Sequence, residues 1–327
     1  MTRATGLGSW PGTDVREATV TVRDLLLDGG GLPYLPELPA RGPGADLIGR
    51  GAGLLVELPV DLQPAGWRFV DRPGRDAART AALRREELDV AAEVYDGYAG
   101  DLKVQVAGPW TLAASVELTR GERAIVDEGA SRDLVESLAE GVRALLADLR
   151  RQVPGARVVL QVDEPSLPAV LEGSLPTASG YGRVRAVDPQ VVAEGLRRVL
   201  AAADGPTVVH SCHPRAPLPL LRATGATAVS VDLTAASPAR WESVAATLED
   251  GIEVYAGVLA TDGSATARTA RATVVDGMER AGLDAAALRR VVVTPTCGLA
   301  GLTAEGARDV HRVALEVAHA LTELAEG

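Results

Sequence analysis

Thr207-Val208-Val209-His210-Ser211-Cys212 joins a short β-branched run to a histidine and a cysteine, and similar runs recur on both sides of it. Apolar runs of this length are typical of buried strands. From Gln152 onward the sequence predicts five of them, over Arg157–Val162, Thr207–Ser211, Ala226–Asp232, Glu253–Val258 and Val291–Thr296. Short strands separated by longer segments predict the repeated βα units of an α/β protein with a parallel sheet.

The longer segments carry apolar residues at helical spacing. They predict helices over Asp188–Ala203, Ala216–Thr224, Pro238–Glu249, Ala265–Ala281 and Thr303–Glu326. Asp188 and Ser237 are residue types that cap helix N-termini, and each stands at the start of one of these segments. The second half of the chain therefore predicts helices packed outside the sheet.

The first half repeats this pattern less regularly. It predicts a helix over Val15–Leu27, strands near Thr5–Leu7, Leu32–Leu35, Gly53–Leu58 and Lys103–Val106, and a proline-rich loop over Pro33–Gly44. With about eight strands in all, we expect a single (β/α)8 barrel over residues 1–327, with its chemistry at the carboxyl ends of the strands. An open doubly wound sheet is the alternative, but no Gly-x-Gly-x-x-Gly turn follows the first strand.

Charge and cysteine usage narrow the class of protein. The formal net charge is -11 and Lys103 is the only lysine, so no basic stripe suggests nucleic acid. Cys212 and Cys297 are the only cysteines and no apolar leader opens the chain, so we expect a cytoplasmic protein with reduced thiols. No run reaches the roughly 18 apolar residues of a membrane span.

Polar residues that could bind a metal, bind a substrate or take part in catalysis fall at or just past the predicted strand ends. These are Ser9, Glu37, Asp163, His210, Cys212, Asp232 and Cys297. In a parallel barrel the carboxyl ends of all strands meet around one cavity, so we expect these side chains to converge.

His210, Cys212 and Cys297 are three soft ligands of the kind that bind zinc. Asp232 ends the next strand and is a candidate for the fourth position. A substrate thiol at such an ion is held as thiolate and is a nucleophile towards a methyl group. The alternative is that both cysteines are small buried hydrophobes and that His210 is a hydrogen-bonded core residue.

Gln161-Val162-Asp163-Glu164-Pro165 places two carboxylates at a strand end. A buried acid needs a cationic partner, and a substrate ammonium group is one candidate. A carboxylate that caps the next helix, or that pairs with an arginine, is the other reading.

Several segments, in the same order along the chain, resemble the catalytic C-terminal barrel of cobalamin-independent methionine synthase. Two of them resemble the zinc-ligand segments His-Met-Cys and Pro-Asp-Cys-Gly-Leu of that family, and three resemble its Ile-Gly-Ser-Phe-Pro, Thr-Gly-Pro-Val-Thr-Ile and Gln-Ile-Asp-Glu-Pro motifs. In the same order as these five family motifs, the segments of this chain are His210–Cys212, Pro295–Leu299, Gly6–Pro11, Ala107–Leu112 and Gln161–Pro165.

The resemblance implies a (β/α)8 barrel that methylates the thiol of homocysteine to give methionine, with zinc holding the thiol. It implies His210, Cys212 and Cys297 as zinc ligands, with Asp232 in place of a glutamate ligand. The homocysteine-binding positions that it implies are Leu7, Gly8, Ser9, Glu37 and Asp163, and Asp163 would meet the amino group.

The methyl-donor half of the family pattern is altered. Ser115 stands near the position of the folate-stacking tryptophan, and Ala169 near that of a folate-binding glutamate. The proton-donor histidine is missing, which leaves Asp262 as the candidate catalytic acid, and we expect no counterpart of the family's second, N-terminal barrel in these 327 residues. The methyl donor is either methyltetrahydrofolate or a methylated corrinoid protein. Because a demethylated folate must be protonated as it leaves, the altered folate-binding positions and the missing histidine favour the corrinoid protein.

Three other functions stay open at the level of sequence. One is a uroporphyrinogen decarboxylase-like barrel enzyme, although a decarboxylase does not need two cysteines and a histidine together. Another is methylation of a different thiol by the same barrel. The third is a non-catalytic zinc-binding protein, in which four protein ligands would close the site.

Overall fold

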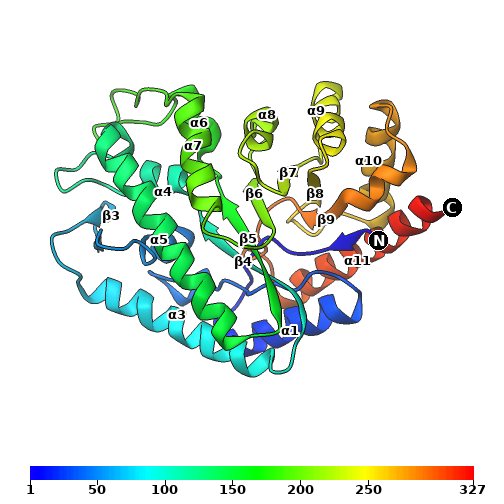
Figure 1. Ribbon diagram of the computed structural model, residues 1–327, viewed down its shortest axis with the longest axis horizontal. Coiled ribbons are helices and arrows are strands. Elements are labelled where there is room, and N and C mark those ends of the chain that lie inside the picture. Colours follow the sequence, from blue (N-terminus) through cyan, green and yellow to red (C-terminus); the bar gives the residue numbers. More distant parts are fainter.

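The β-branched runs form a parallel sheet that curls into a half-barrel (Figure 1). The computed structural model describes residues 1–327. Across the sheet the strand order is β1-β9-β8-β7-β6-β5-β4, and all neighbours are parallel. The strands are β1 (Arg3–Ala4), β4 (Gly100–Ala107), β5 (Ala156–Asp163), β6 (Thr207–Ser211), β7 (Ala228–Asp232), β8 (Glu253–Leu259) and β9 (Val291–Pro295). The predicted α/β class and the five strands of the second half are confirmed.

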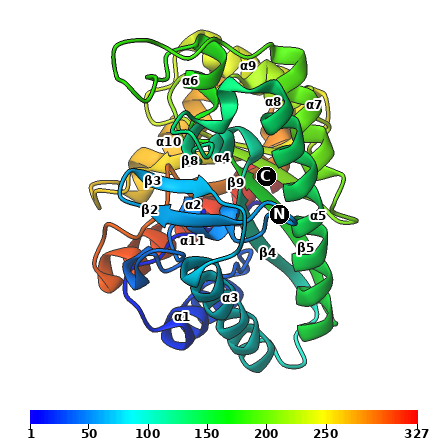
Figure 2. The same cartoon turned by 90° about the vertical axis from the view of Figure 1, so that its left-hand side faces the viewer.

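The helices surround the sheet (Figures 1 and 2). They are α1 (Val15–Asp28), α2 (Leu47–Ala52), α3 (Arg75–Val94), α4 (Pro109–Ser115), α5 (Glu128–Gln152), α6 (Leu167–Glu172), α7 (Pro189–Leu200), α8 (Leu218–Arg222), α9 (Pro238–Glu249), α10 (Ala267–Arg280) and α11 (Ala304–Glu326), with short 3-10 helices at Pro39–Arg41, Ala124–Val126 and Ala285–Arg290. Neighbours pack in the series α7, α5, α3, α1, α11, α10, α9 and α8, and α8 returns to α7. None of these helices is long and apolar enough to cross a membrane.

Helix starts follow the predicted caps. The Asp188 side chain accepts a hydrogen bond from the backbone N–H of Gln190 at the start of α7, and Ser237 accepts one from Arg240 at the start of α9. Each cap satisfies a backbone donor that the first turn leaves without a helical partner. The local sequence therefore fixes where these helices begin.

One segment of the first half bonds to both edges of the sheet. The N–H of Leu32 donates to the Ala4 carbonyl over 2.8 Å, at the β1 edge. At the β4 edge, the N–H of Lys103 donates to the Pro33 carbonyl over 2.9 Å, and the N–H of Leu35 donates to the Lys103 carbonyl over 3.0 Å. Pro33 lacks an N–H, so the predicted strand near Leu32–Leu35 is reduced to an isolated bridge between Tyr34 and Lys103.

Two predictions for the first half are wrong. The first strand is Arg3–Ala4 rather than Thr5–Leu7, since only Arg3 and Ala4 pair with β9 in the sheet. Residues 53–58 form no strand, because Gly53 caps α2 and its N–H donates to the Gly49 carbonyl. An antiparallel hairpin follows instead, with β2 (Val60–Gln63) and β3 (Gly66–Phe69).

Alternating side chains of the strands build a separate apolar cluster, apart from the large core that packs against the helices. The cluster is Leu32, Val159, Val208, Ala228, Tyr255 and Val292. On β5, Gln161 and Asp163 share a face with Val159, because side chains alternate along a strand. The polar side chains that follow therefore rest on a packed apolar floor.

Replacing Leu32 by alanine tests the importance of this floor. Leu32 is fully buried, so Leu32→Ala should lower the free energy of unfolding by about 2–5 kcal/mol through lost burial and a cavity. Leu27, on α1, is 37% exposed, and Leu27→Ala should cost within about 0.5 kcal/mol. Urea unfolding of both variants makes the comparison, and equal costs would contradict a packed floor.

Candidate active site

Two cysteines and a histidine meet past the carboxyl ends of β6 and β9. The Cys297 thiol interacts with the side chains of Cys212 and His210. The pKa of Cys297 is lowered to about 4 by the Cys212 thiol first and by His210 second, and sharing a hydrogen bond with Cys297 raises the pKa of Cys212. Nδ1 of His210 lies 2.9 Å from the Ser230 hydroxyl, which leaves the other ring nitrogen for the cysteines. The predicted convergence of these three residues is therefore observed.

Asp163 lies beside this cluster, because β5 and β6 pair in a register that sets Asp163 opposite His210. Its Oδ1 accepts a 2.7 Å hydrogen bond from Gln161. Burial raises the pKa of Asp163, while His210, Gln161 and Lys103 act in the opposite direction. The carboxylate is thus buried with partial compensation, as expected of a group that receives a cation.

The segment Leu7–Ser9 passes close to the same residues. Gly8 has a φ of +128°, and a Cβ there would lie 2.6 Å from the Gln105 side chain, so only glycine fits. The Leu7 carbonyl accepts a 2.9 Å hydrogen bond from the Gln161 side chain. The backbone at Leu7 and Gly8 is therefore held against β4 and β5.

Ser9 connects this segment to the loop that carries Cys297. The N–H of Leu299 donates to the Ser9 carbonyl over 2.9 Å. A Cβ on Gly298 would lie 1.9 Å from the Ser9 hydroxyl, so the residue after Cys297 must be glycine for the two segments to pack. The Leu7–Ser9 segment thus bonds to Gln161 at one end and to the loop that carries Cys297 at the other.

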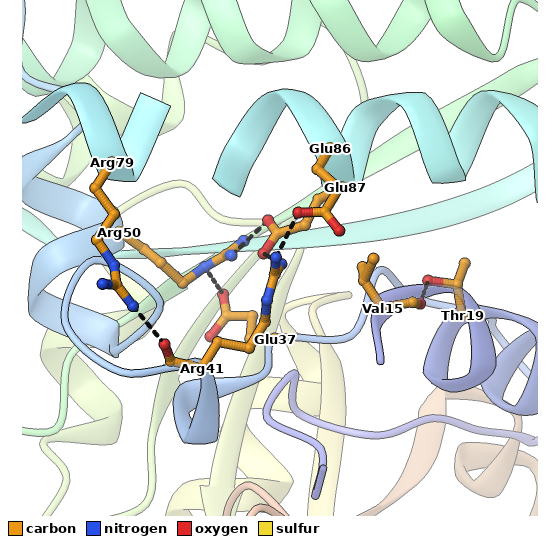
Figure 3. Close-up of polar contacts among 8 residues, drawn as sticks. All are labelled: Val15, Thr19, Glu37, Arg41, Arg50, Arg79, Glu86 and Glu87. Atoms are coloured by element: carbon orange, nitrogen blue, oxygen red, sulfur yellow. Dashed lines mark hydrogen bonds and ion pairs between the residues drawn. The ribbon is translucent and has the colours of Figure 1, made fainter. Parts of the chain in front are cut away.

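Glu37 is buried at the start of a chain of ion pairs (Figure 3). Its backbone N–H donates to the Gly8 carbonyl over 3.0 Å, and its carbonyl accepts from Trp10 over 2.8 Å. Nε of Arg50 lies 3.3 Å from Glu37 Oε1, and Nη1 of the same guanidinium lies 2.5 Å from Glu87 Oε2. Arg50 therefore neutralises two carboxylates at once.

The chain of ion pairs continues outward to the protein surface. Arg41 pairs with Glu86 and lies 3.8 Å from Glu87. Arg79 donates a 2.7 Å hydrogen bond to the Arg41 carbonyl. The proline-rich segment before Arg41 is therefore fixed to α3 at this end, close to Glu37.

A cavity of about 40 Å³ adjoins Arg50 and Glu87, between α1, α2, α3, β4 and α5. The Thr80 hydroxyl, Glu87 Oε1 and Gln105 Oε1 are buried there without a protein hydrogen-bond partner. At roughly 10–15 Å³ per water, this space admits only a few water molecules.

Two predicted acids do not join the cluster. Asp232, which ends β7, accepts from the N–H and the hydroxyl of Thr234 over 2.8 and 2.7 Å. Asp262 is exposed, and hydrogen bonds from Ser264 lower its pKa, which favours the ionised form and not a proton donor. As the side chains stand, no group of three or more His, Cys, Asp or Glu residues is arranged to hold a metal ion. The roles of Asp232 and Asp262 stay predictions.

Glu164 caps a helix, which is one of the roles that the sequence left open for Asp163 and Glu164. Its carboxylate accepts from the N–H groups of Trp110 and Thr111, over 2.9 and 2.8 Å, and from the Thr111 hydroxyl over 2.7 Å. These donors open α4. Burial raises the pKa of Glu164 to about 7, against these hydrogen bonds. Asp163 faces the cysteines, while Glu164 caps a helix.

Three residues of the site were missed at the level of sequence: Lys103, Gln161 and Arg50. Lys103 and Gln161 carried a usable signal, since both interrupt apolar strands with a polar side chain, and Gln161 precedes Asp163 by two positions. Arg50 carried none, because the chain is rich in arginine.

Replacing Glu37 by glutamine should change how stability depends on pH. Burial raises the pKa of Glu37 from 4.5 to about 7, although Arg50 opposes the rise. Because the folded pKa lies above the unfolded one, the stability from Glu37 is present below about pH 4.5 and is lost as pH rises towards about 7. Glu37→Gln should remove up to about 3 kcal/mol of this fall. Urea unfolding at about pH 5 and about pH 8 measures the fall in the free energy of unfolding for both proteins. An identical fall in variant and wild type would contradict the prediction.

Comparison with known proteins agrees with this geometry. Residues 1–320 match the family described as cobalamin-independent synthase, catalytic domain. A B12-independent methionine synthase from Shewanella sp. W3-18-1, solved in complex with selenomethionine, has a similar fold. The TM-score is 0.69 at 12% sequence identity, over 99% of this chain and 98% of that one. No functionally curated protein matches the sequence.

The family match spans nearly the whole chain, including the segments that carry Asp163, His210, Cys212 and Cys297. The structural likeness independently supports the fold. This chain therefore belongs to the cobalamin-independent methionine synthase family, as the catalytic domain, and is a methyltransferase.

Proposed function

We propose that this methyltransferase methylates the thiol of homocysteine to give methionine, with zinc as its metal. The observation that carries the proposal is the contact of Cys297 with Cys212 and His210, beside the buried Asp163. Thiol activation and amino-group recognition would then be side by side. The selenomethionine in the Shewanella enzyme, an analogue of the proposed product, supports an amino acid in this fold.

The donor set fits zinc by its chemistry. Two thiols and an imidazole are soft ligands, and the lowered pKa of Cys297 favours its thiolate form. Both cysteines are free and their thiols lie near each other, although the side chains are not arranged as a metal site. Metal binding would replace the thiol protons, so the closeness of the three side chains supports the proposal. When bound, zinc would hold a substrate thiol as thiolate, although a free thiol has a pKa of about 8.5.

The remaining site residues would bind and orient the amino acid. Asp163 would accept hydrogen bonds from the ammonium group, and Glu37, whose backbone bonds to Gly8, would support the substrate-binding segment beside it. The Leu7–Ser9 backbone, held between Gln161 and the Cys297 loop, would line the substrate. In the transfer the substrate thiol loses its proton, the sulfur forms a bond to the methyl carbon, and the bond between donor and methyl breaks.

We infer a methylated corrinoid protein as the donor rather than methyltetrahydrofolate. Breaking the methyl–nitrogen bond of a folate needs a proton on the leaving nitrogen, and the candidate acid Asp262 has a lowered pKa. Breaking the methyl–cobalt bond of a corrinoid leaves its electron pair on cobalt and needs no proton. Ser115 at the end of α4 and Ala169 in α6 offer neither a stacking ring nor a carboxylate.

We also infer that the curled sheet is a (β/α)8 barrel closed by the Leu32–Glu37 segment. The backbone hydrogen bonds of this segment to Ala4 on one edge and Lys103 on the other support closure. The uninterrupted series of packed helices around the sheet supports it as well. In that barrel Glu37 occupies the same end as the cysteines.

Zinc content is the first measurement. Elemental mass spectrometry should find about one zinc per chain in the wild type, and much less in Cys297→Ser, which loses a ligand. Asp232→Asn is the matched comparison, because it lowers zinc content only if this carboxylate is a ligand. Wild type that holds no zinc after reconstitution would refute the proposed site.

Methyl transfer to homocysteine identifies the donor. With zinc-loaded protein, methylcobalamin should yield methionine at least about tenfold faster than methyltetrahydrofolate, because the site lacks an acid to protonate the departing folate. A tenfold ratio of rates corresponds to a difference of about 1.4 kcal/mol in activation free energy. Methionine is measured by mass spectrometry. Equal rates with the two donors would contradict the corrinoid inference and leave homocysteine methylation standing.

A further inference from the structure

The single lysine of the chain is buried inside the curled sheet. Lys103, on β4, has no exposed surface. Its Nζ donates a 2.7 Å hydrogen bond to Gln161 Oε1 and lies 5.1 Å from the centre of the Tyr34 ring. Burying an ammonium group is costly, so a cation here without a carboxylate in direct contact calls for an explanation.

Lys103 settles which way the Gln161 amide points. A protonated lysine only donates, so it faces the amide oxygen and turns the amide nitrogen to the other side. That nitrogen donates to the Leu7 carbonyl over 2.9 Å and to Asp163 Oδ1 over 2.7 Å. A flipped amide would set its oxygen against both acceptors, so Lys103 excludes that orientation.

The charges around Lys103 agree with a cation at neutral pH. Burial lowers the pKa of Lys103 to about 8, while Asp163 on β5 and Glu37 oppose this. Tyr34 presents its ring to the ammonium, and its hydroxyl lies 3.2 Å from Nε2 of His311, on α11. Burial lowers the pKa of His311 to about 4, so this neighbour is neutral and does not repel Lys103.

We propose that Lys103 is a positioning residue that, through Gln161, holds the Asp163 carboxylate and the Leu7 carbonyl as paired acceptors for the ammonium group of the amino-acid substrate. Both acceptors keep lone pairs free after bonding to Gln161. The role rests on the proposed function, because it assumes an amino acid at this end of the sheet. Lys103 itself need not touch the substrate.

Two thiols that differ only in the amino group test this role. L-homocysteine and 4-mercaptobutanoic acid, which lacks the amino group, are titrated calorimetrically into zinc-loaded wild type and Lys103→Met. Wild type should prefer homocysteine. In Lys103→Met homocysteine should bind about 10- to 100-fold more weakly, because a hydrogen bond to a charged group is worth about 1.5–3 kcal/mol, while the analogue binds as before.

Two further variants make the result decisive. Tyr34→Phe removes a buried hydroxyl beside Lys103 but keeps the ring and the Gln161 bond, so it should keep the preference. Lys103→Met with Gln161→Met removes both partners and leaves no orphaned buried group, so it guards against misfolding of the single variant. It should lose the preference to the same extent, because Lys103 acts through Gln161.

The outcomes separate the two hypotheses. Wild type that does not prefer homocysteine refutes the amino-acid substrate and leaves nothing for Lys103 to position. Wild type with the preference, and a double variant that keeps it, overturns the role of Lys103 alone. Equal weakening of both thiols in the variants would also overturn it, because that is the result of a general structural defect.

Discussion

Backbone hydrogen bonding between parallel neighbouring strands sets the positions of the strand residues on which the candidate active site is built. The register sets Asp163 opposite His210, and His210 opposite Ser230. Because all strands point the same way, residues far apart in sequence reach one end together. The contact of Cys297 with Cys212 and His210 follows from this alignment and not from local sequence.

Buried charge is the second determinant, and the protein handles it in three ways. Glu37 shares the guanidinium of Arg50 with Glu87. These ion pairs attach the Leu32–Glu37 segment, which bonds to both edges of the sheet, to helices α2 and α3. Glu164 accepts the free N–H groups at the start of α4. Lys103 has a neutral amide and an aromatic ring as its nearest partners. Asp163 is a buried carboxylate beside His210 and the cysteines, and the proposed recognition of a substrate amino group rests on it.

The regular second half was predictable, since each strand is a short β-branched run and α7 and α9 carry their own capping side chains. The first half was not, because prolines suppress the strand pattern at Leu32–Leu35 and an apolar run after α2 folds into a turn. Among the site residues, the positions of His210, Cys212 and Cys297 at or just past predicted strand ends predicted their convergence. Asp232 was chosen by the strand-end rule and Asp262 by the family resemblance, yet each side chain bonds to a residue two positions further along the chain.

By itself the sequence determined the α/β class, the elements of the second half and the soft donor set on which the proposed thiol activation rests. These depend on residue type and on neighbours along the chain, which a sequence displays directly. Only the tertiary structure decided that Glu164 caps a helix while Asp163 faces the cysteines, that Arg50 neutralises Glu37, and that Lys103 orients an amide. Those outcomes depend on which side chains meet across the sheet, and hydrogen bonds between distant residues leave no local pattern.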